Sequence, residues 1–128
     1  MPPRAIILSL DQLSRRCLGC YGHEWIETPN WDRLASRAVV FDQCVASPSP
    51  QSALPDAMRI FCDRLSSDGI VAKRLSELAV SDTDELSQTA FAQLMTAAEK
   101  VLGKLSRDKT ASWLLCLESS SPRYTLCT

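Results

Sequence analysis

Hydrophobic positions along the chain alternate between short continuous apolar runs and stretches in which apolar residues recur every three to four positions. Continuous runs with β-branched or aromatic residues predict strands, and the wider spacing predicts helices with one buried face. The predicted strands are Ala5–Leu10, Val39–Phe41, Ile70–Ala72 and Ser112–Leu117. Because Ala5–Leu10 is apolar on both faces, we expect it to be central and buried in one sheet with the others.

Three helices are predicted between these strands. Their ranges are Pro29 to about Arg37, Asp56–Ser67, and about Ser81 to Leu105. Thr28 offers an N-cap hydroxyl and Pro29 suits the first helical position. Gly69 is placed to end the second helix, and Asp82 with Glu85 forms a capping box for the third. The prolines in Ser47–Pro55 predict an extended segment outside any helix.

The composition fits this alternation of strands and helices. The chain has 128 residues, of which 45% are hydrophobic and 23% charged, as in one ordinary globular domain. We therefore expect residues 1–128 to form a single α/β domain with a mostly parallel sheet flanked by helices. The net charge of −1 gives no basic surface for nucleic acid or membranes, so neither is an expected partner. The first apolar run is too short for a signal peptide, which predicts a cytoplasmic location.

Six cysteines occur in the chain, and without a secretory signal we expect reduced thiols. Cys62 lies on the apolar face of a predicted helix and Cys116 lies inside an apolar run, so both are predicted to be buried. Cys17 and Cys20 have the C-x-x-C spacing of half a zinc site or of a redox pair. No second pair repeats that spacing, but a zinc or redox module stays an alternative. The lone His23 is typical of a surface or packing residue.

Asp11 follows the first predicted strand directly. Ligands of open α/β sheets bind beyond the carboxyl ends of the strands, and a carboxylate there suits a hard divalent cation. The alternative is that Asp11 only caps the loop that follows it.

Four segments between residues 5 and 42 resemble the N-terminal part of the sulfatase family in the alkaline phosphatase superfamily. They are Ala5–Asp11, Gly19–Gly22, Thr28–Ala35 and Val39–Asp42. The resemblance implies an α/β fold in which Asp11, with Gln12 beside it, ligates Ca²⁺ or a similar ion. In that family the ion binds the sulfate or phosphate oxygens of a small anionic ester.

The family's nucleophile motif, Cys/Ser-x-Pro-x-Arg, would fall in Ala46–Leu54, which has no Cys and no Arg in register. Neither Ser47 nor Ser49 has a base nearby in the sequence, and a serine nucleophile needs one. The family's later metal ligands, an Asp with His or Asn and then a Lys and a His, are not matched either. We therefore assign no catalytic residue.

The sequence thus predicts a truncated or degenerate sulfatase-like domain without catalytic activity of its own. No cofactor is expected except a divalent cation such as Ca²⁺, if the family site is retained. The alternative is a non-enzymatic binding or interaction module that keeps the fold. The partner we expect is a protein that completes the fold, and a small anionic ester is expected as a substrate only if the domain is active.

Overall fold

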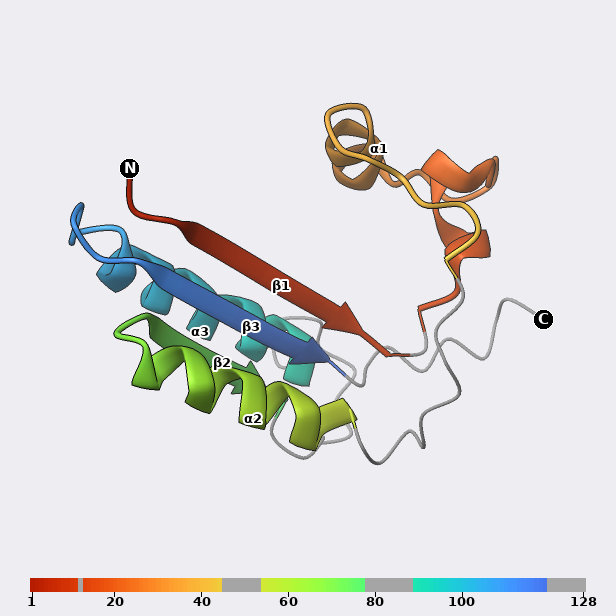
Figure 1. The fold of residues 1–128 in the computed structure, drawn as a ribbon. Helices are drawn as coiled ribbons and strands as arrows, with labels where there is room; N and C mark the ends of the chain where they lie inside the picture. The colour runs from red at the N-terminus through yellow and green to blue at the C-terminus, as the bar shows by residue number, and fades with distance from the viewer. Residues whose placement is uncertain (12, 45–53, 78–88, 120–128) are drawn as a thin grey trace.

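The computed structural model describes residues 1–11, 13–44, 54–77 and 89–119. Their centre is a three-stranded sheet in the order β1-β3-β2, with both strand pairs parallel (Figure 1). The strands are β1 (Arg4–Leu10), β2 (Val71–Ser76) and β3 (Trp113–Ser119). Helices flank the sheet, which confirms the predicted α/β class with a parallel sheet.

The central strand is β3, so the prediction that residues 5–10 lie in the centre was wrong. Residues 113–117 of β3 are all buried, whereas Ile6 and Leu8 of the edge strand β1 are 52% and 39% exposed. The run in β3 is apolar at five successive positions, while β1 also contains Arg4 and Ser9. β3 also ends in two polar residues, Glu118 and Ser119, but both side chains are hydrogen-bonded, to Arg74 and Glu77. The place covered on both faces therefore goes to the strand with the longer unbroken apolar run.

Two helices cover opposite faces of β3 and β2: α2 (Leu54–Ser67) lies on one side and α3 (Ala90–Leu105) on the other (Figure 1). Each helix forms a separate apolar layer with alternate residues of β3, as expected when side chains alternate across a strand. The α2 layer contains Met58, Cys62, Leu65, Leu114 and Cys116; the α3 layer contains Leu94, Ala98, Trp113, Leu115 and Leu117.

The end of α2 confirms the role predicted for Gly69. Its φ is +79°, its N–H donates to the carbonyl of Ser66, and the N–H of Ile70 donates to the carbonyl of Leu65. This is the left-handed helix ending that favours glycine. At the other end, α2 includes Pro55, which corrects the prediction that this proline lies outside the helix. A proline fits there because the first turn needs no intrahelical N–H donor.

The start predicted for the third helix was also wrong. α3 begins at Ala90, and Thr89 before it is extended, with ψ of 149°. The Thr89 hydroxyl accepts a hydrogen bond from the N–H of Ala92, which is an N-cap that fixes the start of α3. Asp82 and Glu85, the predicted capping box, lie outside the described residues.

Between β1 and α2, the described residues 11 and 13–44 contain three short helices: η1 (Arg15–Cys17), η2 (Gly19–Tyr21) and α1 (Pro29–Ala35). They lie beyond the carboxyl end of β1, away from the sheet (Figure 1). Pro29 opens α1 as predicted, but residues 39–41 do not form the predicted strand. Val39 and Phe41 are 78% and 70% exposed. Strand propensity depends on packing against neighbouring strands, and residues 39–41 pair with none of the strands that the structure describes.

Candidate functional site

Asp11 lies where the sequence predicted it, directly after the carboxyl end of β1, and it is exposed. Its backbone N–H donates a hydrogen bond of 2.8 Å to the carbonyl oxygen of Ser119, the last residue of β3. The bond fixes the start of the following loop against the central strand. Gln12, the predicted neighbour in the metal site, lies outside the described residues.

The ends of β2 and β3 carry two further carboxylates, and both accept hydrogen bonds from the protein itself. The guanidinium of Arg74 donates to one oxygen of Glu118 at 2.9 and 2.6 Å, and both side chains are more than two thirds buried. The buried hydroxyl of Ser119 donates to Glu77. These contacts join the ends of β2 and β3.

The described residues do not by themselves fit a calcium ion. Calcium takes about six to eight oxygen ligands, usually with more than one carboxylate. Within residues 1–11, 13–44, 54–77 and 89–119, no group of three or more His, Cys, Asp or Glu side chains is placed to hold a metal. An ion at Asp11 therefore needs ligands from outside this described part.

The Gly-Cys-Tyr-Gly loop and the start of α1 are joined by a short hydrogen-bond chain. The N–H of Gly19 donates to the Thr28 hydroxyl oxygen at 2.8 Å, and that hydroxyl donates to the Asp32 carboxylate at 3.3 Å. Thr28 stands at the predicted N-cap position, but its hydroxyl caps no N–H of α1 and accepts the Gly19 N–H instead. Two of the sulfatase-like segments thus hold each other in place.

Gly19 also has a steric reason to be glycine. A Cβ atom added there would lie 2.8 Å from Oδ2 of Asp32, closer than a Cβ atom normally comes to a non-bonded atom. Close approach of a neighbouring group to the backbone is one of the positions that glycine serves. The motif residues Gly19, Thr28 and Asp32 therefore form one packed unit.

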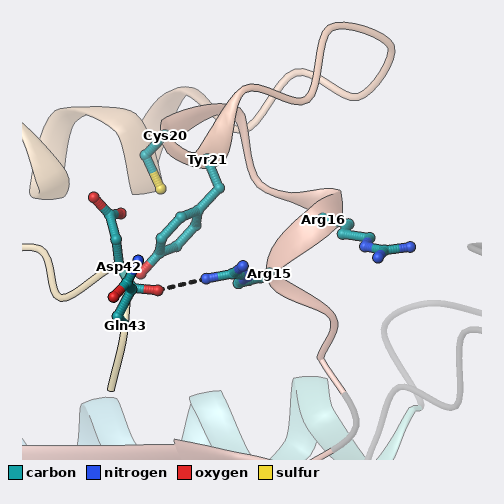
Figure 2. A pocket seen from close by; sticks show the side chains of 6 residues that line it. All are labelled: Arg15, Arg16, Cys20, Tyr21, Asp42 and Gln43. Atoms are coloured by element: carbon teal, nitrogen blue, oxygen red, sulfur yellow. Dashed lines mark hydrogen bonds between the residues drawn. The ribbon is translucent and has the colours of Figure 1, made fainter. Parts of the chain in front are cut away.

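Beside this unit is an open polar cavity of about 460 Å³, drawn in Figure 2. Its lining residues are Arg15, Arg16, Cys20, Tyr21, Asp42 and Gln43. The Arg15 guanidinium donates to the backbone carbonyl of Asp42 at 2.6 Å and lies 5.8 Å from the centre of the Tyr21 ring. The Arg16 side chain points away from the other five (Figure 2).

Arg15 and Arg16 were not among the site residues predicted from the sequence. The signal was present as two adjacent cationic residues just before the Gly-Cys-Tyr-Gly loop. Arg15 uses its donors on a neutral carbonyl, so its charge still attracts anions, while the Asp42 carboxylate in the same lining opposes that attraction.

His23 has a structural place in this region, as expected for a lone histidine. Its Nδ1 accepts hydrogen bonds from the backbone N–H groups of Trp25 at 3.2 Å and Ile26 at 3.0 Å. An imidazole nitrogen that accepts two backbone donors is occupied in holding a turn. The geometry therefore offers no general base at His23.

The other residues weighed from the sequence are placed as follows. Cys17 is buried and Cys20 is half-buried. Ser47 and Ser49 lie outside the described residues. No helix in the described part of the chain combines the length and apolar character needed to cross a membrane.

Comparison with known proteins finds partial similarity to sulfatases. The chain is 39% identical over 44 residues to an N-acetylglucosamine-6-O-sulfatase of Bacteroides thetaiotaomicron, which covers 34% of this chain and 8% of that protein. It is 37% identical over 54 residues to an arylsulfatase of Clostridium perfringens, covering 37% of this chain and 11% of the relative. It is 38% identical over 65 residues to an iduronate 2-sulfatase of Mus musculus, and this match covers 44% of this chain and 12% of the relative.

These matches confirm the resemblance to sulfatases that the motif segments predicted. The chain spans only about a tenth of the length of these curated relatives. No protein-family model matches the chain, and no solved structure matches it significantly. The similarity is therefore distant and partial, and it defines a sulfatase-like α/β segment.

Proposed function

We propose that this chain forms the strand-and-helix framework of a sulfatase-like domain and does not hydrolyse esters on its own. In this proposal Asp11, with Gln12, contributes one part of a divalent-cation site for a small anionic ester. The observation that carries the proposal is the place of Asp11, exposed at the carboxyl end of a parallel strand and fixed by its N–H to Ser119. Ligands of such sheets bind at that edge.

The chemistry of the described residues supports the absence of independent activity. The carboxylates of Glu77 and Glu118 near Asp11 accept hydrogen bonds from Ser119 and Arg74, and the His23 ring accepts two backbone donors. An oxygen or sulfur nucleophile requires an activating base or a lowered pKa, and these three groups are already engaged in hydrogen bonds within the protein.

Exposed apolar side chains support completion of the domain by further polypeptide. Six such residues lie on β1, on α1 or shortly after α1: Ile6, Leu8, Leu34, Val39, Val40 and Phe41. Large apolar side chains left exposed in this number are consistent with packing of another segment or partner against them. The same surface also favours the second candidate function, a non-enzymatic interaction module that keeps the fold.

An activity assay tests the first part of this proposal. The purified chain is incubated with 4-nitrophenyl sulfate and 4-nitrophenyl phosphate in the presence of Ca²⁺, Mg²⁺ or Mn²⁺. We expect no product above a buffer blank, and no change in Ser47→Ala or Ser49→Ala. Robust turnover that is lost in either serine variant would overturn the claim that the chain is inactive alone.

Calorimetry tests the role of Asp11. One carboxylate replaces little of the hydration shell of Ca²⁺, so we expect at best about millimolar affinity for the isolated chain, as at sparse oxygen sites. Asp11→Asn should leave the thermal stability in Ca²⁺ unchanged. Micromolar binding that disappears in Asp11→Asn would show instead that the chain holds a complete cation site.

A further inference from the structure

Two buried thiols of different elements lie in contact in the α2 layer. The Sγ atoms of Cys62 on α2 and Cys116 on β3 are 3.6 Å apart, although the residues are 54 positions apart in the sequence. Cys62 is 7% exposed and Cys116 is 0% exposed. Both are free thiols, and they pack with Leu114 in one apolar cluster.

We propose that Cys62 and Cys116 form a reversible disulfide that joins α2 to the central strand when a disulfide oxidant such as oxidised glutathione reaches them. A disulfide needs a sulfur–sulfur distance of about 2.05 Å, so the two atoms must approach by roughly 1.5 Å. Small rotations of the two side chains and a slight shift of the helix toward the sheet supply an approach of this size.

Disulfide exchange between the two thiols and oxidised glutathione proceeds in two steps. The Cys62 thiolate attacks one sulfur of oxidised glutathione, the glutathione S–S bond breaks, and one glutathione thiolate leaves. The Cys116 thiolate then attacks the sulfur of Cys62 and releases the second glutathione. The two protein thiols lose two electrons and two protons, and one glutathione disulfide becomes two glutathione thiols.

Cys62 takes the first step because it is the more accessible of the two thiols. Burial raises the pKa of Cys116 to about 12, and the hydrogen bond with Cys62 adds to the shift. Little Cys116 thiolate is therefore present at neutral pH, and its attack is slow in the closed structure. The same burial shields the finished disulfide from reductants, so the bond is slow to form and slow to break.

Peptide mapping tests the proposal directly. The full chain is incubated with oxidised glutathione at pH 8, remaining thiols are alkylated, and the protein is digested with trypsin without reduction. Cys62 falls in the peptide Ile60–Arg64 and Cys116 in Thr110–Arg123, each with a single cysteine. We expect these two peptides joined, with the mass of their sum less two hydrogens. Recovery of both as alkylated peptides, or joined only to other cysteine peptides, would overturn the proposal.

Variants and a thermal measurement complete the test. Cys62→Ala should abolish the joined peptide, whereas Cys44→Ala, at an exposed cysteine, should leave it unchanged. Closing a long loop should raise the Tm of the oxidised chain by about 10 °C, and dithiothreitol should reverse the rise. The melting comparison uses the unaltered chain, so it decides the matter even if Cys62→Ala fails to fold. An oxidised chain with an unchanged Tm would contradict the cross-link between α2 and β3.

Discussion

The half of the molecule built from β2, β3, α2 and α3 differs sharply from the half that carries the sulfatase-like segments. Eight of the nine buried apolar residues that the structure describes belong to the first half. In residues 1–44, apart from residue 12, Cys17 is the one buried apolar residue, and α1 buries none. Trp25 is 92% exposed and Val39 78% exposed.

The two halves are therefore held by different forces. Apolar burial, which scales with the area removed from water, stabilises the sheet and its two helices. Hydrogen bonds such as Gly19 to Thr28 and Trp25 to His23 fix the motif-bearing half, and each adds only about 1 kcal/mol net. Such a region opens locally at low cost unless another segment covers it.

Backbone hydrogen bonds connect the halves at both ends of β1. The N–H of Trp113 donates to the carbonyl of Pro3, and at the other end Asp11 donates to Ser119. Between them, β1 pairs with β3 along its length. The molecule thus consists of a packed core and a motif region that is attached to it mainly through one edge strand.

Leu115→Ala should have the largest effect on stability. Leu115 on β3 is 0% exposed and packs against α3. Removing its side chain should lower the free energy of unfolding by about 3 kcal/mol. The matched control is Leu34→Ala on α1, where the leucine is 58% exposed and the loss should stay below about 0.5 kcal/mol.

Urea unfolding followed by far-UV circular dichroism measures both variants. The comparison between the halves fails if the two substitutions cost the same, because α1 would then contribute to the core as strongly as β3 does. A drop confined to Leu115→Ala supports the separation.

The sequence was a good guide wherever a local pattern decides the structure. The apolar run of β3 and the glycine at the end of α2 were both found, because burial and backbone conformation are visible in the residues themselves. The place of β1 at the edge and the absence of a strand at residues 39–41 were missed. Strand order depends on which segments pair, and single segments carry no information on their partners.

In the candidate site, too, the sequence could place a residue that follows a single strand but not contacts between distant segments. Asp11 could be placed from the sequence because a parallel strand fixes which end faces the ligand edge. The bond from Arg74 to Glu118 spans 44 positions, and the contact of Arg15 with Asp42 spans 27. Contacts at such separations are set by tertiary structure, so no local pattern could reveal them.

Gly19→Ala should have a smaller effect, and it tests whether the motif region is built as one unit. The new Cβ would lie 2.8 Å from Oδ2 of Asp32, so the carboxylate must turn aside and weaken its hydrogen bond with Thr28. We expect a loss of up to about 1 kcal/mol in the unfolding free energy of that region. The matched control is Gly103→Ala in α3, where nothing lies within 4 Å of the added atom. Alanine should stabilise that helix by up to about 1 kcal/mol.

Native-state hydrogen exchange of the amides in η2 and α1 measures the first variant, and urea unfolding measures the second. Opposite signs for the two glycines are the expected result. If Gly19→Ala leaves exchange in α1 unchanged, the loop and the helix are not coupled as the hydrogen-bond chain implies.

The smallest effect is expected at Asp108, in the turn before β3. The backbone carbonyl of Asp108 accepts a hydrogen bond from Arg4 at the start of β1. The Asp108 carboxylate accepts the Thr110 hydroxyl at 2.7 Å, the Thr110 N–H at 2.9 Å and the Ala111 N–H at 3.2 Å. The hydrogen bond from the Thr110 side chain, followed by that from its backbone, holds the pKa of Asp108 below its ordinary value of 3.8.

A pKa lowered by folding means that the ionised carboxylate favours the folded state. Its contribution is present above the ordinary pKa and is lost as pH falls through the lowered value, so the effect should appear below about pH 4. Asp108→Asn keeps an oxygen acceptor for Thr110 but cannot titrate. We therefore expect the fall in unfolding free energy between pH 5 and pH 3, measured with urea, to be slightly smaller in Asp108→Asn than in the unaltered chain. Because Asp108 is exposed, the difference should be small and should shrink further in high salt. An equal fall in both proteins would mean that this turn does not contribute to the attachment of β1 through its charge.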